Sequence, residues 1–128
     1  MKILGIGVDI IQNNRIKNSI KNHKFRDRIY SKNELKLSVS SKNKIGYFSK
    51  RFAAKEAFAK ALGTGFRNNL NFKDIEVIND KLGKPYYSKS NKINQIVKKK
   101  FKVKNFNCFL SISDEKDYST AFTIIQTR

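Results

Sequence analysis

RFAAKEAFAKALGTG, at residues 51–65, is the stretch that decides the fold of this chain. Alanine is the strongest helix former, so its five alanines predict a helix over residues 49–62. Gly63 suits the C-cap, because helices commonly end on a residue in the left-handed conformation. The turn Gly63-Thr64-Gly65 also carries backbone N–H groups that could donate to a phosphate. From the sequence, a simple cap and a phosphate-binding turn both stay open.

The predicted helix places Glu56 and Lys60 on one face, because residues four apart are neighbours on a helix. A surface ion pair with this spacing is worth only about 0.3–0.5 kcal/mol and is an ordinary structural feature. Phe52 and Ala59 lie close to Glu56, however, and make this face less polar than a free solvent face. The pair therefore fits either a surface ion pair or part of a functional site.

Upstream, residues 2–11 read KILGIGVDII and alternate with the period of a β-strand. One face is apolar and carries Leu4, Ile6, Val8 and Ile10. The other face places Gly5 and Gly7 beside Asp9. Glycine weakens a strand, so it often marks close approach by a ligand or by another backbone. An acid at the end of a buried strand is costly unless it is paired or binds a metal, although Asp9 could also cap the next helix.

Asp9 and Glu56 are the two carboxylates that we select as metal ligands. Mg²⁺ prefers one or two carboxylates together with waters and substrate phosphates. Lys60 would add a second positive contact, so the three residues predict phosphoryl-group chemistry if the fold brings them together. The sequence has no Gly-x-x-x-x-Gly-Lys-Ser/Thr motif, which excludes a P-loop nucleotide hydrolase. It has no His/Cys cluster, which argues against zinc.

The remaining pattern predicts one α+β domain over residues 1–128, with a mostly antiparallel sheet packed against helices. A basic helix is expected over residues 13–28, with Ile16, Ile20 and Phe25 on its inner side. A short helix is expected near Ser31, where Glu34 completes a capping box. The other expected elements are a loop at 38–46, a helix at 90–101 and strands at 72–78, 85–87, 106–113 and 118–127.

The composition is strongly basic, with 28 Lys and Arg against 10 Asp and Glu and a formal net charge of +18. Such a charge favours acidic partners, although the AT-rich codons of Lys, Asn and Ile account for part of the excess. A small basic RNA-binding protein is therefore the alternative function. Against it, the sequence has no aromatic RNP motif, KH loop or zinc knuckle, and RNA binding gives Asp9 and Glu56 no role.

The cysteine content and the lengths of the apolar runs indicate the cellular compartment. Cys108 is the single cysteine, so no internal disulfide can form, and a buried, reduced thiol is expected. No apolar run approaches the roughly 18–20 residues needed to cross a bilayer, and Asp9 interrupts the N-terminal apolar run. We expect a cytoplasmic protein that has neither a membrane nor a nucleic acid as its partner.

Four stretches resemble the holo-[acyl-carrier-protein] synthases. GIGVDIIQNNR at residues 5–15 resembles the N-terminal motif of that family, and RFAAKEAFAKALGTG resembles its central motif. DIEVINDKLGKPY at 74–86 and LSISDEKDYSTAF at 110–122 are similar to its two remaining motifs. The four occur in the expected order and cover nearly the whole chain. The resemblance implies a 4′-phosphopantetheinyl transferase-like fold.

The resemblance further implies a Mg²⁺-dependent enzyme of fatty acid biosynthesis. Such an enzyme moves 4′-phosphopantetheine from coenzyme A to a serine of apo-acyl carrier protein and releases adenosine 3′,5′-bisphosphate. It also implies a homotrimer whose active sites lie between neighbouring subunits. Its partners would be coenzyme A and an acyl carrier protein, which is usually strongly acidic.

The resemblance assigns roles to positions of this sequence. Asp9 and Glu56 fall on the metal ligands, and Glu56 and Lys60 on the catalytic positions, with Glu56 or a water beside it as the candidate base. Coenzyme A would be held by Arg51, Lys60, Gly63 and Gly65. The carrier protein would be gripped by Arg15, together with Lys21 and Lys24 of the same basic segment.

One departure from the family pattern concerns the last motif. The family usually has Ser-x-Ser-His, whereas this chain has Ser111-Ile112-Ser113-Asp114. A carboxylate that pointed inward would repel an anionic cofactor, so we expect Asp114 to turn away or to bind a cation or a lysine. An inactive relative that binds coenzyme A without turnover is a third interpretation.

Overall fold

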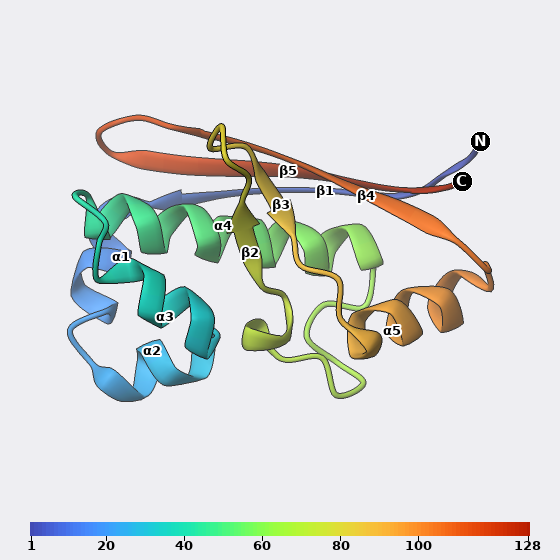
Figure 1. The fold of residues 1–128 in the computed structure, drawn as a ribbon, viewed down its shortest axis with the longest axis horizontal. Helices are drawn as coiled ribbons and strands as arrows, with labels where there is room; N and C mark the ends of the chain where they lie inside the picture. Colours follow the sequence, from blue (N-terminus) through green and yellow to red (C-terminus); the bar gives the residue numbers. More distant parts are fainter.

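A three-stranded antiparallel sheet lying on one long helix organises the chain (Figure 1). The computed structural model describes residues 1–128. The sheet has the order β1-β5-β4, in which β5 (Tyr118–Thr127) lies between β1 (Ile3–Gln12) and β4 (Phe106–Asp114). Helix α4 (Lys44–Leu62) runs beneath the sheet. The predicted α+β class and mostly antiparallel sheet are confirmed.

The two glycines of β1 allow α4 to approach the strand. A Cβ added to Gly5 would lie 1.8 Å from the carbonyl oxygen of Ala61, and one added to Gly7 would lie 1.9 Å from that of Ala57. Both neighbours are helix backbone, which cannot rotate away as a side chain could. The close approach predicted at these glycines is therefore made by another backbone, and it brings Asp9 of the same strand against α4.

The predicted basic helix over residues 13–28 is wrong in one respect, because the segment forms two helices. Helix α1 is Asn13–Ser19 and α2 is His23–Ile29. Asn22 causes the break, since its side chain accepts from the backbone N–H of Lys24 at 2.8 Å and caps α2. Lys21 consequently lies in the turn between the helices.

The middle of the chain differs from the prediction at two further places. The predicted strand at 72–78 begins as the 3-10 turn η1 (Phe72–Asp74), and only β2 (Val77–Asn79) is extended. Asp74 favours the turn, because its side chain accepts from the N–H of Asn71 at 2.9 Å. Helix α4 begins at Lys44, inside the predicted loop, where the side chain of Asn43 accepts from the N–H of Gly46 at 3.0 Å.

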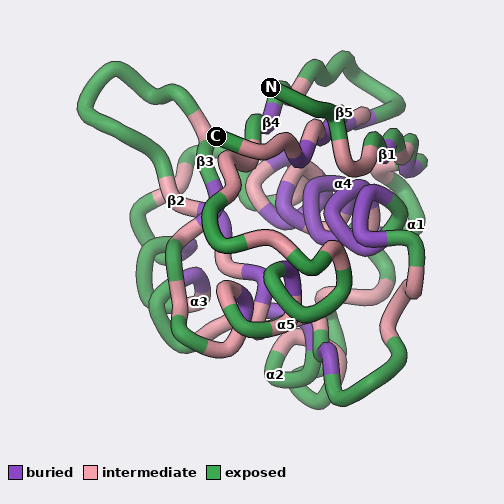
Figure 2. The backbone as a smooth tube through the Cα atoms, turned by 90° about the vertical axis from the view of Figure 1, so that its right-hand side faces the viewer, coloured by how far each residue is buried: buried purple, intermediate pink, exposed green.

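The other elements agree with the sequence patterns to within about one residue. Helix α3 is Lys32–Ser38 and has the predicted capping box between Ser31 and Glu34. Strand β3 (Pro85–Tyr87) pairs with β2 as a hairpin, and α5 is Asn91–Phe101. Figure 1 shows α2, α3 and α5 on the side of α4 that faces away from the sheet. Figure 2 shows that buried residues concentrate along α4, so this helix is the centre of the core.

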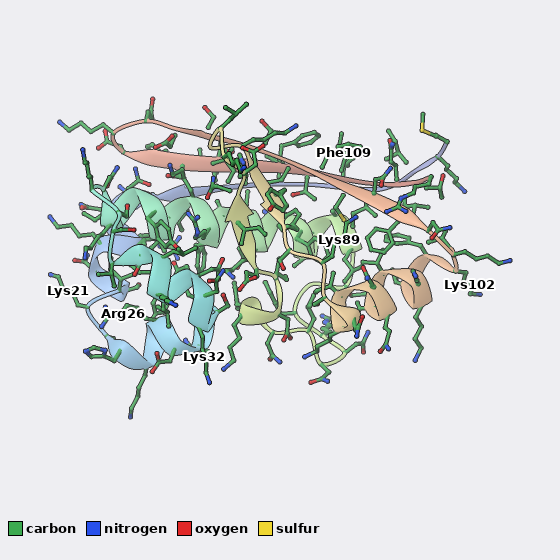
Figure 3. All side chains as sticks on the ribbon, viewed as in Figure 1. Lys21, Arg26, Lys32, Lys89, Lys102 and Phe109 are labelled. Atoms are coloured by element: carbon green, nitrogen blue, oxygen red, sulfur yellow. The ribbon has the colours of Figure 1, made fainter.

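The opposite face of the sheet is apolar and exposed. Ile6, Val8 and Ile10 of β1 are 59%, 56% and 64% exposed. Phe122 of β5 is 41% exposed, and Phe109 of β4 is 48% exposed and projects away from the helices (Figure 3). We call these five residues the outer face. None of the helices is long and apolar enough to cross a membrane.

Candidate active site

Asp9, Glu56 and Lys60 meet where α4 passes under the edge strand β1. The ammonium of Lys60 lies 3.1 Å from Oδ1 of Asp9 and also donates to the carbonyl oxygen of Val8 at 3.0 Å. Lys60 therefore pairs with the strand, and no ion pair joins it to Glu56 on its own helix. The ammonium stays half exposed while the Asp9 carboxylate is only 15% exposed, so the site opens to solvent on the lysine side.

The charge of Asp9 acts on Glu56. The pKa of Glu56 is raised, chiefly because burial disfavours its charged form and secondly because the negative charge of Asp9 repels it. Lys60 opposes both effects and lowers the pKa. The two carboxylates that the sequence separates by 47 positions thus lie close enough to repel one another, and Lys60 offsets only part of the repulsion.

This arrangement fits a hard divalent cation. Two neighbouring carboxylates on an open rim are the donor set that Mg²⁺ takes from a protein when waters and substrate phosphates complete its coordination. No group of three or more His, Cys, Asp and Glu side chains in the chain could hold a metal by itself. The residues present therefore suit an ion that is shared with a phosphate ligand, rather than an ion fully enclosed by protein.

The turn after α4 combines a cap with free N–H groups. Gly63 has a φ of +87° and caps the helix, and its N–H donates to the carbonyls of Ala59 and Lys60 at 3.1 Å. Neither Thr64 nor Gly65 donates its N–H to another backbone carbonyl. Different residues of the turn therefore suit the two functions. Gly63 ends the helix, and the N–H groups of Thr64 and Gly65 are left available to donate to a ligand.

Arg51 lies on the side of α4 that is opposite to Lys60. It precedes Lys60 by nine residues, which places it about 180° around α4. Its guanidinium is buried, donates to Oδ1 of Asn79 at 2.7 Å and stacks 3.6 Å above the ring of Tyr47. Its Nε is buried without any partner, and burial lowers the pKa of the side chain. Arg51 lines a pocket of about 330 Å³ that also includes Lys50 and Asp114.

Asp114 lines this pocket and also a neighbouring hollow that includes Asn13 and Lys116. It is the last residue of β4, it is exposed, and no Lys or Arg nitrogen lies within 4.0 Å of its carboxylate. It therefore adds negative charge to a pocket that Arg51 and Lys50 make positive. The expected pairing with a lysine is absent, whereas the other two expectations, turning away and binding a cation, stay predictions.

Arg15, Lys21 and Lys24 are all exposed, on α1, in the turn and on α2 respectively. Figure 3 shows Lys21 pointing outward at this end of the molecule. The three side chains make no ion pair within the chain, so their charges face solvent.

The chain is similar to known proteins over nearly its whole length. Residues 5–123 match the model of the 4′-phosphopantetheinyl transferase superfamily. The chain belongs to that superfamily. Within it, a holo-[acyl-carrier-protein] synthase of Pelagibacter ubique is 62% identical over 128 residues, which is 100% of both chains. The resemblance of the sequence motifs to the holo-[acyl-carrier-protein] synthases is confirmed.

Solved structures of superfamily members have the same fold. The crystal structure of holo-[acyl-carrier-protein] synthase from Neisseria meningitidis superposes with a TM-score of 0.88 at 36% identity, over 98% of this chain and 99% of the other. The synthase from Bacillus anthracis, in complex with CoA (3′,5′-ADP), gives 0.82 at 35% identity over 100% of both chains. Nothing in these comparisons supports the RNA-binding alternative.

Sequence reasoning missed the groups that surround Arg51. Tyr47 precedes it by one helical turn, so the i, i+4 spacing could have identified this contact. Asn79 comes from β2, and no local pattern connects it to α4. Its hydrogen bond to Arg51 became visible only in the folded chain.

Proposed function

We propose that this chain is a holo-[acyl-carrier-protein] synthase. It transfers 4′-phosphopantetheine from coenzyme A to a serine of apo-acyl carrier protein and releases adenosine 3′,5′-bisphosphate, in fatty acid biosynthesis. Residues 1–128 act as one transferase domain, and we place the enzyme in the cytoplasm. The observation that carries the proposal is the convergence of Asp9, Glu56 and Lys60 at one open rim.

Asp9 and Glu56 would hold the Mg²⁺ ion. An ion held there would supply positive charge to the pyrophosphate of coenzyme A, whose cleavage requires charge neutralisation. Lys60 is the second cation of the site. Because it pairs with Asp9 through a half-exposed contact of 3.1 Å, it can exchange the carboxylate for a phosphate oxygen at little cost.

Glu56 is our candidate for the group that takes the proton of the carrier serine. A general base works best when its pKa approaches the working pH. Burial and the charge of Asp9 raise the pKa of Glu56 in the metal-free site. A Mg²⁺ ion held by the same carboxylate would lower this pKa again, so a water beside Glu56 is the other candidate base. The N–H groups of Thr64 and Gly65 lie one turn beyond Lys60 and would donate to the phosphates.

A single chain does not contain the whole coenzyme site in this proposal. Asp9 belongs to the edge strand β1, whereas the Arg51 pocket opens beside β4, the opposite edge of the sheet. The buried, unpartnered Nε of Arg51 supports a second anion site there. We therefore propose that Arg51 of one copy and Lys60 of a neighbour bind the same coenzyme A molecule.

The outer face supports a homotrimer. A monomer that exposed this contiguous apolar face would be prone to association, and in a closed ring of three copies each face would be covered by its two neighbours. Closed association through the sheets would bring β1 of one copy near β4 of the next. The exposed cations Arg15, Lys21 and Lys24 remain free in this arrangement to attract the acidic carrier.

Complementation between two inactive variants tests the shared site. Apo-carrier protein, coenzyme A and Mg²⁺ are supplied, and the mass gain of the carrier is followed. Glu56→Gln removes the proposed metal site and Arg51→Ala the proposed anion pocket, so each alone should be inactive or strongly impaired. When the two are refolded together, about one quarter of the sites combine an intact Glu56 with an intact Arg51.

Recovery of activity on mixing would support a site shared between copies. Full activity in Glu56→Gln alone would reject the metal assignment. No recovery from a mixture in which native mass spectrometry detects mixed trimers would reject the shared site.

A further inference from the structure

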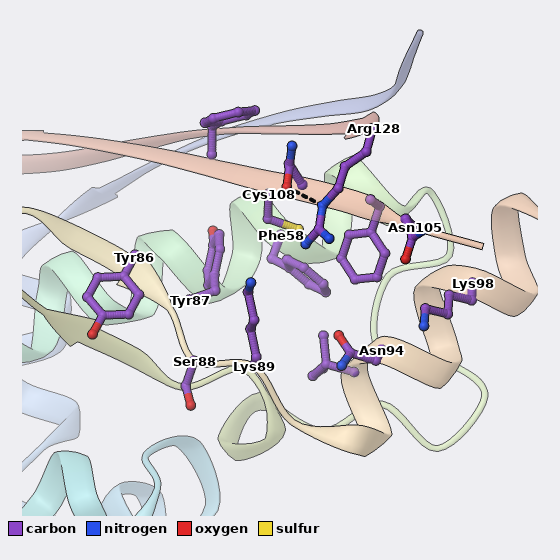
Figure 4. A pocket seen from close by; sticks show the side chains of 14 residues that line it. Phe58, Tyr86, Tyr87, Ser88, Lys89, Asn94, Lys98, Asn105, Cys108 and Arg128 are labelled. Carbon is purple, nitrogen blue, oxygen red and sulfur yellow. Dashed lines mark hydrogen bonds between the residues drawn. The ribbon is translucent and has the colours of Figure 1, made fainter. Parts of the chain in front are cut away.

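A second hollow lies on the β4 side of the molecule, at the other end of the strand from the Arg51 pocket. It has a volume of about 520 Å³ and opens between β3, α5 and the start of β4 (Figure 4). Small-molecule sites have volumes of about 300–1,000 Å³. The hollow shares no lining residue with the Arg51 pocket, and none of Asp9, Glu56 and Lys60 lines it. We call it the β4–α5 cleft.

The lining of the cleft contains basic side chains and no acidic side chain. Lys89, Lys98 and Arg128 line it from three separate segments, and no Asp or Glu is among the lining residues. None of the three has an acidic partner within 4.0 Å. Figure 4 shows Lys89 and Lys98 directed into the cleft. Three converging cations repel one another, so an anion that enters the cleft is stabilised by all of them.

The remaining lining combines aromatic rings with free amide groups. Phe106, which is partly exposed, and Tyr87, which is 9% exposed, form an aromatic wall that the fully buried Phe58 supports from behind. The side-chain amides of Asn94 and Asn105 also face the cleft and are free, since none of the hydrogen bonds within the chain uses them. An amide both donates and accepts, which matches the edge of a heteroaromatic base. Aromatic side chains offer a base a stacking surface.

We propose that the β4–α5 cleft is a second ligand site, separate from the coenzyme site, and that it binds a mononucleotide. The base would stack on the aromatic wall and meet Asn94 or Asn105, and the phosphate would lie between Lys89 and Lys98. An alkyl chain with an anionic head would use the cations and the apolar wall but would leave both amides unpaired. The amides are the feature that favours a nucleotide. This proposal does not depend on the proposed transferase activity.

The test measures binding of adenosine 5′-monophosphate to the full-length chain by calorimetry, in the wild type and in Lys60→Met. Lys60→Met weakens the proposed coenzyme site and leaves every lining residue of the cleft unchanged. Lys89→Gln should weaken binding about tenfold, because it removes a charge-assisted hydrogen bond. Lys104→Gln is the matched control, since it removes the same charge from an exposed position outside the cleft and should leave binding unchanged.

Cys108 provides a second measurement that locates the ligand. It is the single cysteine of the chain, and it lines the cleft near Lys89 (Figure 4). Burial raises the pKa of its thiol to about 12, so alkylation by iodoacetamide is followed at alkaline pH, where more thiolate is present. Nucleotide binding should slow this alkylation in the wild type and should slow it less in Lys89→Gln at the same nucleotide concentration. Unchanged alkylation at saturating nucleotide would overturn the proposed location.

Three results would overturn the choice of ligand. Decyl phosphate that binds as tightly as the nucleotide would show that the cleft takes an anionic amphiphile. Ribose 5-phosphate that binds as tightly would show that the base contributes nothing. Nucleotide binding that Lys60→Met weakens and Lys89→Gln leaves unchanged would show that only the coenzyme site is occupied.

Discussion

Removal of the ammonium group of Lys55 should destabilise this protein more than the loss of any surface charge. Nζ of Lys55 lies 2.7 Å from Oε1 of Glu34, and both side chains are 0% exposed. The ammonium also donates to the carbonyls of Phe72 at 3.1 Å and Ile75 at 2.6 Å. The other oxygen of Glu34 accepts from the N–H of Val77 at 3.0 Å. One buried pair thus connects α3, α4, η1 and β2.

Lys55→Met keeps most of the side-chain volume but leaves the Glu34 carboxylate buried without its counter-ion. Breaking a buried ion pair in this way costs about 3–5 kcal/mol. Single domains have a total stability of about 5–15 kcal/mol, so the variant is expected to lose a large part of its free energy of unfolding. The double variant Glu34→Leu/Lys55→Met should recover much of the loss, because it also removes the unpaired charge.

Urea unfolding followed by far-UV circular dichroism measures these changes, at one fixed protein concentration because association also stabilises the fold. Lys92→Met is the matched control. Lys92 lies 2.6 Å from Asp74, but these side chains are 36% and 21% exposed, so the loss should stay below about 1 kcal/mol. The reasoning is refuted if Lys55→Met loses no more stability than Lys92→Met.

Four further changes test the proposed site. Because burial and Asp9 raise the pKa of Glu56 above its ordinary value of 4.5, the folded protein binds that proton more tightly than the unfolded chain and loses stability as the pH rises through this range. Glu56→Gln should therefore melt at a higher temperature than the wild type at neutral pH. If the variant still melts at a higher temperature than the wild type below pH 4.5, the raised pKa of Glu56 is not the reason. Lys60→Met should tighten Mg²⁺ binding by up to about fivefold in calorimetry, because it frees Asp9 from an exposed ion pair of roughly 1 kcal/mol. The same variant should raise KM for coenzyme A more than KM for the carrier, and the reverse order would count against its phosphate role. Asp114→His should lower KM for coenzyme A, since it removes a negative charge from the Arg51 pocket, and an unchanged KM would place the cofactor elsewhere. Arg15→Glu should slow transfer most at low salt, whereas a salt-independent effect would remove Arg15 from the carrier-binding surface.

Local patterns in the sequence predicted most of the secondary structure. The alanine-rich stretch, the alternation of residues 2–11 and the Ser31–Glu34 capping box all depend on neighbours in the chain, and each of these elements is present. The errors also have local causes. At Asn22 and Asp74, a side chain that accepts from the backbone outweighed the helix or strand pattern around it.

The candidate site was harder to predict, because its residues meet only across the fold. The motifs selected Asp9, Glu56 and Lys60, but a helical i, i+4 spacing suggested that Lys60 pairs with Glu56. In the structure Lys60 reaches across to Asp9 on β1. Arg51 belongs to the same sequence motif as Lys60, yet helical rotation places it on the opposite side of α4.

Which residues share a face, and to which superfamily the chain belongs, could both be read from the order of the amino acids. The periodicity of β1 grouped Ile6, Val8 and Ile10 on one side and Gly5 and Gly7 on the other, because side chains alternate along any strand. Only the tertiary structure decided which side meets the core. The glycine side packs on α4 because a helix backbone can lie against a strand only where no Cβ intervenes, and the apolar side is left exposed.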